Sequence, residues 1–144
     1  MKIQIVSDLH LDLGNTSIIS KTDSDIIVFA GNISNGFKLE SEFAKKIAKS
    51  HKKKVIMVNG NSSFHNNNLY EVQKKWRNAN IPNVKYLDHT TGFIADGINF
   101  LGGTLWIDYT NKTDCWTFTS EIKEDIDSIK VSNASLLTPN ISTH

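Results

Sequence analysis

Three short apolar runs, each followed at once by a polar turn, are the feature that most constrains the fold of this chain. They lie at residues 2–6, 26–30 and 54–58. Apolar runs of this length predict buried strands, and the stretch between the second and third run has the spacing of an amphipathic helix. Strands that alternate with helices predict an α/β fold, in which crossover helices cover a mainly parallel sheet.

Helical spacing occurs both before and after the third run. In the first helical segment Glu42 stands four residues before Lys46, a pairing that suits a solvated face. In the second segment Asn68 has the position of an N-cap with Glu71 three residues later, and Pro82 marks the end. The predicted apolar faces are Leu39, Phe43, Ala44, Ile47 and Ala48 in the first segment, and Leu69, Val72, Trp76 and Ala79 in the second.

The elements after the second helix are shorter. We predict a strand at residues 84–87, a hairpin at 93–100 with Asp96 and Gly97 in a type I′ turn, and an apolar strand at 101–106 whose glycines permit a close approach or a bulge. A last helical stripe is formed by Phe118, Ile122, Ile126 and Ile129. We therefore divide the chain into one domain, residues 1–131, and a polar tail, residues 132–144.

Metal-ligating side chains follow each of the three runs. Asp8 and His10 come after the first, Asn32 after the second and Asn61 after the third. Because the carboxyl ends of parallel strands meet at one edge, where such sheets bind ligands, these side chains are expected to converge. Any one of these turns alone has the composition of an ordinary structural turn. Together they predict a metal site of Asp8, His10, Asn32 and Asn61.

The order of these turns resembles the calcineurin-like metallophosphoesterases. Their pattern is Asp-x-His, then Gly-Asp, then Gly-Asn-His followed by Glu or Asp. This chain keeps the first motif but has Gly31-Asn32 for the second and Gly60-Asn61-Ser62-Ser63 for the third. Residues 100–106 are similar to a Gly-x-Thr-Leu-Trp strand of one bacterial branch. The resemblance implies an αββα sandwich that is incomplete here, with a mainly parallel first sheet plus a hairpin.

The chemistry that this resemblance implies is phosphoester hydrolysis at two metal ions. Asp8 and His10 would hold one ion, Asn61 the other, and Asn32 stands where an aspartate would bridge both. Two divalent ions about 3.5 Å apart repel by roughly 19 kcal/mol at an effective dielectric near 20, and a neutral amide offsets less of this than a carboxylate does. Ser62 occupies the position of the catalytic histidine and cannot act as an acid at neutral pH. No catalytic residue is therefore retained.

The downstream histidine motifs of the family, Gly-His and Gly-His-x-His, do not occur in the sequence. His65 follows the third motif and is interpreted as a packing or helix-entry residue. We therefore expect at most one divalent metal, Mn, Fe or Zn, bound weakly. The second sheet is also represented only by its start, so an apolar sheet face is expected to lie open unless a partner or a second copy of the chain covers it.

Composition excludes several other classes of protein. A net charge of +1 and a single short basic cluster, Lys52-Lys53-Lys54, give no surface for nucleic acid. Asp8 and His10 interrupt the first apolar run before it reaches the length of a signal peptide, and no run is long enough to cross a membrane. A single cysteine, Cys115, cannot form an internal disulfide, which suits the cytoplasm.

Three functional hypotheses remain open. The favoured one is a family member whose hydrolase activity is lost or vestigial. The second is an enzyme with one metal and low activity on phosphomonoesters or phosphodiesters. The third is a non-catalytic module that binds a phosphorylated small molecule in the crevice at the strand ends, or a protein on the open sheet. A doubly wound nucleotide-binding protein of another family ranks a poor fourth, because no glycine-rich phosphate loop follows any strand.

Overall fold

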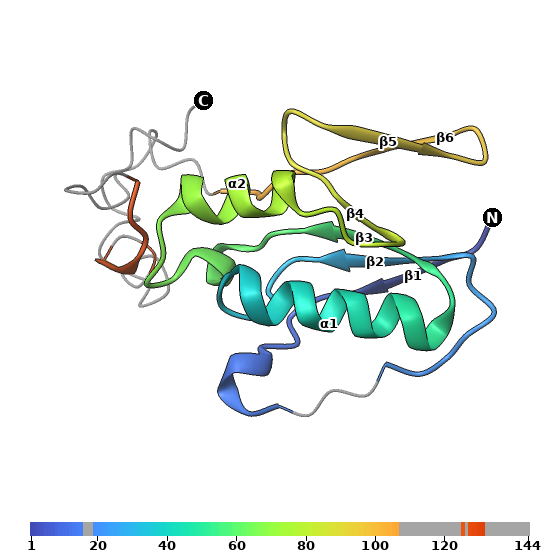
Figure 1. Cartoon of the computed structure of the whole chain (residues 1–144), viewed down its shortest axis with the longest axis horizontal. Helices are drawn as coiled ribbons and strands as arrows, with labels where there is room; N and C mark the ends of the chain where they lie inside the picture. The colour runs from blue at the N-terminus through green and yellow to red at the C-terminus, as the bar shows by residue number, and fades with distance from the viewer. Residues whose placement is uncertain (16–18, 107–124, 126, 132–144) are drawn as a thin grey trace, which may run out of the picture.

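The computed structural model describes residues 1–15, 19–106, 125 and 127–131. Figure 1 shows two layers, a sheet and a pair of helices, with a separate hairpin beside them. The elements, in chain order, are β1 (Ile3–Val6), η1 (Leu11–Leu13), β2 (Ile26–Ala30), α1 (Gly36–His51), β3 (Lys54–Val58), η2 (Asn61–Phe64), α2 (Leu69–Asn78), β4 (Val84–Tyr86), β5 (Gly92–Ala95) and β6 (Ile98–Leu101).

The sheet has the strand order β1-β2-β3-β4, and every neighbouring pair is parallel. All four strands therefore end at the same edge, where η1 and η2 begin. The hairpin β5–β6 forms a second, antiparallel sheet whose turn places Asp96 at φ 48° and Gly97 at φ 74°. The predicted α/β fold with a parallel first sheet plus a hairpin is confirmed.

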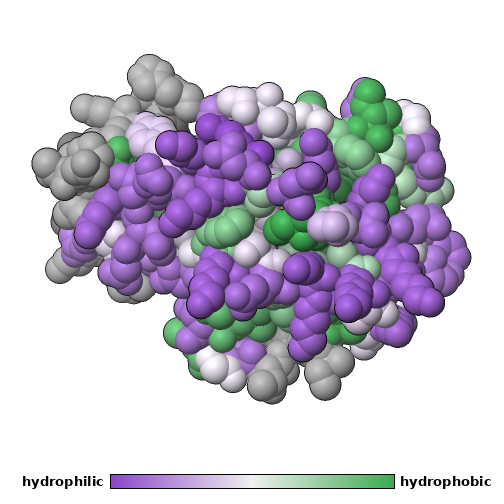
Figure 2. Space-filling view, in the orientation of Figure 1, coloured by the Kyte–Doolittle hydropathy of each residue, from purple (hydrophilic) through white to green (hydrophobic). Residues whose placement is uncertain are grey.

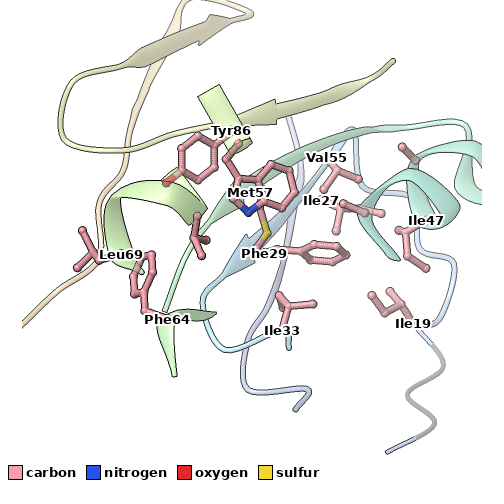
Figure 3. Close-up of a cluster of buried hydrophobic side chains, with 14 of the residues drawn as sticks. Ile19, Ile27, Phe29, Ile33, Ile47, Val55, Met57, Phe64, Leu69 and Tyr86 are labelled. Carbon is pink, nitrogen blue, oxygen red and sulfur yellow. The ribbon is translucent and has the colours of Figure 1, made fainter. Parts of the chain in front are cut away.

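Helices α1 and α2 cover one face of the sheet and enclose the main core (Figure 3). Phe29, Val55 and Met57 of the sheet have no exposed surface there. Trp76 of α2 stacks on Tyr86 with ring centroids 5.3 Å apart. The predicted cap of α2 is also present, since the Asn68 side chain accepts a hydrogen bond from the Glu71 backbone at 3.1 Å.

The described residues cover the opposite face of the sheet only in part. Phe93 and Phe100 of the hairpin pack against a small cluster that contains Ile56. On β1, by contrast, Ile3 is 41% exposed and Ile5 is 70% exposed. Figure 2 shows a largely hydrophilic surface on the helix side, with apolar side chains gathered at the hairpin. What would cover the open part of the sheet stays a prediction.

Two sequence predictions about this fold are wrong. Leu39 is 44% exposed, and its neighbour Glu40 is buried in its place because buried hydrogen-bond donors surround the Glu40 carboxyl group. Residues 102–106 form no strand, since β6 ends at Leu101 and no described strand pairs beyond it. The close approach is confirmed, because a Cβ on Gly102 would lie 2.8 Å from Val58 and 2.9 Å from Leu87.

The last predicted helix lies mostly outside the described residues, as does the polar tail. Ile129, one member of that stripe, is described and fully buried. Ala79 is half-buried and follows the last residue of α2. Within the part of the chain that the structure covers, no helix combines the length and hydropathy needed to cross a lipid bilayer.

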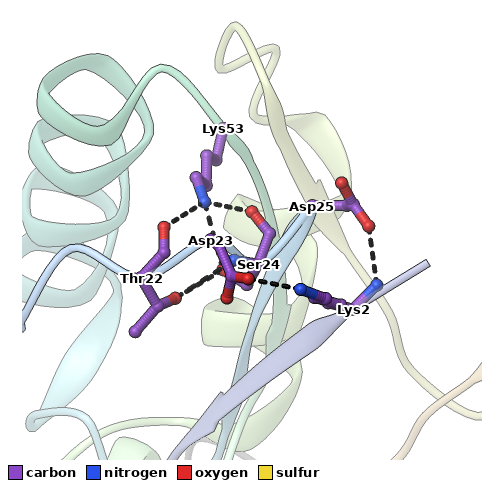
Figure 4. Close-up of polar contacts among 6 residues, drawn as sticks. All are labelled: Lys2, Thr22, Asp23, Ser24, Asp25 and Lys53. Atoms are coloured by element: carbon purple, nitrogen blue, oxygen red, sulfur yellow. Dashed lines mark hydrogen bonds and ion pairs between the residues drawn. The ribbon is translucent and has the colours of Figure 1, made fainter.

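A network of lysine contacts fastens the amino-terminal edge of the sheet (Figure 4). The Lys53 ammonium group donates to the backbone carbonyls of Thr22, at 2.7 Å, and Ser24. Lys2 pairs with Asp23 and donates its backbone N–H to Asp25 at 2.6 Å. Lys53, a member of the short basic cluster, therefore joins the start of β3 to the loop that precedes β2.

Candidate functional site

The turns that follow β1 and β2 are joined by their backbones. Asp8 N–H donates to the Gly31 carbonyl at 3.1 Å, and His10 N–H donates to the Asn32 carbonyl at 3.1 Å. Asp8, His10 and Asn32 all adopt left-handed backbone conformations, with φ of 55°, 45° and 53°. Such conformations cost roughly 1 kcal/mol or more for residues other than glycine, and the hydrogen bonds between the turns hold them.

Asn32 connects the side chains of all three turns. Its Oδ1 accepts hydrogen bonds from the Ser62 backbone N–H, at 3.2 Å, and from the Ser62 hydroxyl, at 2.9 Å. Its Nδ2 donates to Asp8 Oδ1 at 3.0 Å. The orientation of the amide is determined, because a backbone N–H can only donate and therefore requires the oxygen. Asn32 thus turns its nitrogen, and not its oxygen, toward Asp8.

Gly60 allows the second and third turns to approach this closely. A Cβ at Gly60 would lie 2.0 Å from Asn32 Oδ1 and 2.5 Å from the Asn32 backbone nitrogen. A Cβ at Gly31 would in turn lie 3.1 Å from Gly60 Cα. The contact between Asn32 and Ser62 therefore depends on the absence of a side chain at residue 60.

Asp8 carries the charge of the first turn. A hydrogen bond from Ser7, then the one from Asn32, and the nearby His10 together lower the pKa of Asp8, against the effect of burial. The His10 Nε2 lies 3.9 Å from Asp8 Oδ1, and the two side chains are 33% and 62% exposed. Asp8 is thus an ionised, accessible carboxylate with a histidine beside it.

Behind the third turn, Glu40 of α1 is a buried carboxyl group with no exposed surface. It accepts from the Ser63 hydroxyl at 2.5 Å, from Asn59 Nδ2 at 2.8 Å and from Trp76 Nε1 at 3.2 Å. Burial raises the pKa of Glu40 to about 8, although hydrogen bonds from Ser63, Trp76, the Ser34 backbone and Asn59 act in the other direction. Glu40 ties α1 and α2 to the residues on both sides of Asn61.

Asn61 and His65 both contact Asp125, a residue that the sequence analysis did not select. Asn61 Nδ2 lies 3.0 and 3.3 Å from the two Asp125 carboxylate oxygens. His65 Nε2 lies 2.6 Å from Asp125 Oδ1, and the two side chains are 15% and 10% exposed. His65, expected to be a packing or helix-entry residue, thus also pairs with a carboxylate. A partner 60 positions away gives no local sequence signal.

A cleft of about 700 Å³ opens beside the three turns. The sheet surface and residues 101–105 form its walls. Its polar side chains are Asp8, Asn32, Asn59, Asn61 and Thr104, and its larger apolar side chains are Val28, Val58, Leu101 and Leu105. Of the predicted ligands, Asp8, Asn32 and Asn61 thus line one space. His10 lies next to Asp8 outside the cleft wall.

The donor set does not match a two-metal centre. Asn32 offers an amide nitrogen to Asp8, and its oxygen is taken by Ser62. Asn61 donates from its nitrogen to Asp125 and so keeps its oxygen, the atom that would ligate a metal, for the cleft. No group of three or more His, Cys, Asp or Glu side chains that could hold a metal occurs among the residues described. Among the described residues, Asp8, His10 and the Asn61 oxygen are the predicted ligands that remain available near the cleft.

A model of the family described as calcineurin-like phosphoesterase matches residues 1–135 of the 144 residues. No curated protein matches the chain. No solved structure matches it either.

Proposed function

This chain belongs to the calcineurin-like phosphoesterase family, and we propose that it has kept the fold of these enzymes while losing their hydrolytic reaction. The observation that carries the proposal is the orientation of Asn32. Asn32 stands where the family pattern has an aspartate. Its side chain directs an N–H donor toward Asp8, and its carbonyl oxygen already accepts two hydrogen bonds from Ser62.

Hydrogen bonds in this protein take the place of metal coordination in joining the three turns. The family generally binds divalent metals, and an anionic bridge is one term that offsets the repulsion between two such ions. Here a neutral amide links Asp8 to Ser62 with no ion required. Ser62 also lacks the acidity to protonate a leaving group, which removes a contribution of about 10² to 10⁴-fold.

A non-catalytic binding module is the second candidate, and the cleft favours it. Its walls combine a carboxylate with exposed apolar side chains, and nothing in this arrangement depends on a metal. The remaining hypothesis is a weak enzyme with one ion on Asp8 and His10. Two protein ligands alone are fewer than the three that catalytic metal sites usually have.

The purified protein is expected to retain fewer than one transition ion per chain and to show no metal-dependent hydrolysis. The reason is that Ser62 occupies the Asn32 oxygen, so the described residues leave just Asp8, His10 and the Asn61 oxygen as ligands near the cleft. The measurement is Mn and Zn content after desalting, followed by turnover of nitrophenyl phosphate and bis-nitrophenyl phosphate with added Mn.

Asp8→Asn is the control for contaminating phosphatase, since asparagine tolerates the left-handed conformation of residue 8 and lacks the charge. Turnover that persists in this variant comes from contamination. Two ions retained per chain, or turnover that Asp8→Asn abolishes, would contradict the proposal.

The double variant Asn32→Asp with Ser62→His is expected to become dependent on metal for its stability. In the absence of metal, an aspartate at residue 32 would place a second carboxylate about 3.0 Å from Asp8, where like charges repel. Added Mn should raise the melting temperature of the double variant by several degrees and leave that of the unaltered protein unchanged.

Hydrolysis is not expected to return in this double variant. The sequence supplies no Gly-His-x-His motif to complete the coordination of two ions, and missing ligands cost more than altered neighbours. Thermal unfolding with and without Mn tests the first expectation, and turnover tests the second. Robust Mn-dependent turnover in the double variant would show that a histidine of this chain, or of a second copy, completes the site.

A further inference from the structure

The walls of the cleft carry one charge, and it is negative. Asp8 is the only ionised side chain among the described residues that line this space, and no lysine or arginine does. Its side chain is 62% exposed, so a ligand can reach it. A phosphoester carries negative charge as well, and without metal ions the cleft offers no opposite charge to attract it.

The neutral polar side chains of the cleft donate hydrogen bonds to other groups of the protein. Asn32 donates to Asp8, Asn61 to Asp125 and Asn59 to Glu40. The Thr104 hydroxyl donates to the backbone carbonyl of Asn59 at 2.9 Å.

The same residues also present acceptors to the cleft. The Asn61 amide is oriented by Asp125, which can only accept when ionised, so Asn61 Oδ1 is the polar atom left for the cleft. Asn59 Oδ1 is buried with no donor among the described residues. Because Asn59 Oδ1 is buried, the acceptors that a ligand in the cleft meets are the Asp8 carboxylate and Asn61 Oδ1, and these suit a donor better than an anion.

Apolar side chains form the rest of the wall. Leu101 is 85% exposed and Leu105 is 96% exposed, and Val28 and Val58 form the sheet side of the same space. A ligand that fills the cleft would therefore bury apolar surface while placing one polar group against the strand ends.

We propose that this cleft binds a small organic cation, an ammonium group attached to an apolar body, with the ammonium at Asp8 and Asn61 and the apolar body against residues 101–105. The inference rests on the proposed function, because it requires the strand ends to be free of metal. It replaces the phosphorylated ligand that the family resemblance implied with one of opposite charge.

Three probes with the same aromatic ring separate these possibilities: benzylammonium, benzyl alcohol and phenyl phosphate, each titrated in buffer that contains a chelator. Nitrogen–proton correlation spectra give the readout, because Gly31, Gly60, Gly102 and Gly103 line the cleft and glycine amides are easily identified. Benzylammonium is expected to shift these signals with a dissociation constant in the millimolar range of small fragments. Gly97, in the hairpin turn, should not shift.

Asp8→Asn is expected to weaken benzylammonium binding about fivefold, to the level of benzyl alcohol, since exposed ion pairs contribute no more than this. The matched control is Asp96→Asn, which removes an exposed carboxylate at another left-handed position in the hairpin turn. That change should leave the affinity unaltered. Raising the salt concentration should weaken benzylammonium binding and not that of the alcohol.

The inference is overturned if phenyl phosphate binds as tightly as benzylammonium, if Asp8→Asn has no effect, or if none of the three probes shifts the cleft glycines. These results can be told apart from a failure of the proposed function, which would show as retained metal or as turnover. A protein that holds two ions would refute both. A metal-free protein that does not bind benzylammonium refutes only the inference.

Discussion

The unaltered protein is expected to lose stability as the pH rises from about 5 to about 8, and replacing Glu40 by glutamine is expected to abolish this loss. Burial raises the pKa of Glu40 from 4.5 to about 8 in the folded protein. The folded state therefore holds a proton in this range that the unfolded chain releases. The contribution of Glu40 to stability is fully present below pH 4.5 and is lost as the pH rises through about 8.

The expected loss is on the order of 4 kcal/mol, because each unit of pKa difference corresponds to about 1.4 kcal/mol. The neutral form also suits the surrounding hydrogen bonds. A protonated Oε1 can donate to the Ser63 oxygen at 2.5 Å, while Oε2 accepts from Asn59 and Trp76. A glutamine amide reproduces this arrangement at every pH.

Urea unfolding at a series of pH values from 5 to 8.5 measures the effect. The matched control is Glu42→Gln, which removes an exposed carboxylate from the same helix and should keep the slope of the unaltered protein. Histidines contribute equally to the three proteins and cancel in the comparison. A Glu40→Gln protein with the same slope as the unaltered protein would show that Glu40 is ionised in the fold.

Gly60→Ala is expected to destabilise the protein by about 3 kcal/mol, the upper part of the usual range for overpacking. The backbone of Gly60 is extended, at φ −93°, so the cost arises from space and not from conformation. The added Cβ would overlap both the Asn32 side chain and its backbone nitrogen. The second and third turns would have to separate, and the hydrogen bonds from Ser62 to Asn32 would break.

Gly97→Ala is the matched control, because its φ of +74° strains an alanine while no atom lies within 4 Å of the new Cβ. It should cost about 1 kcal/mol, the ordinary penalty of a left-handed alanine. Adding Asn32→Ala to Gly60→Ala should restore part of the lost stability, since only the overlap with the backbone nitrogen remains. Urea unfolding of these variants is the measurement. Equal costs at Gly60 and Gly97 would contradict the close packing of the turns.

The sequence was sufficient for the elements whose burial follows a regular period. The strands near residues 2–6, 26–30, 54–58 and 84–87, the cap at Asn68 and the turn at Asp96-Gly97 are local signals that the structure has, whereas the strand predicted at 101–106 is absent beyond Leu101. Leu39 was misplaced because periodicity ranks side chains by hydropathy. It cannot foresee that Ser63, Asn59 and Trp76 would surround the buried carboxyl group of Glu40.

For the site, the sequence predicted which residues meet but not how they bond. Convergence of Asp8, Asn32 and Asn61 follows from parallel strand order, which is a property of the topology. The direction of the Asn32 amide depends on the serine that replaces a histidine 30 positions later. Asp125 contacts Asn61 although the two residues are 64 positions apart in the sequence. Neither pairing leaves a trace in local composition.

The left-handed conformations of Asp8, His10 and Asn32 also limit which residue types can replace them during evolution. Asparagine, aspartate and glycine accept such a backbone most easily, and β-branched residues accept it least. A complete substitution library at positions 8 and 32, selected only for folded protein, should therefore return mainly these three residue types. Aspartate can persist at position 8 for reasons of backbone shape alone, so an Asp-x-His motif can outlast the metal that its spacing suggests.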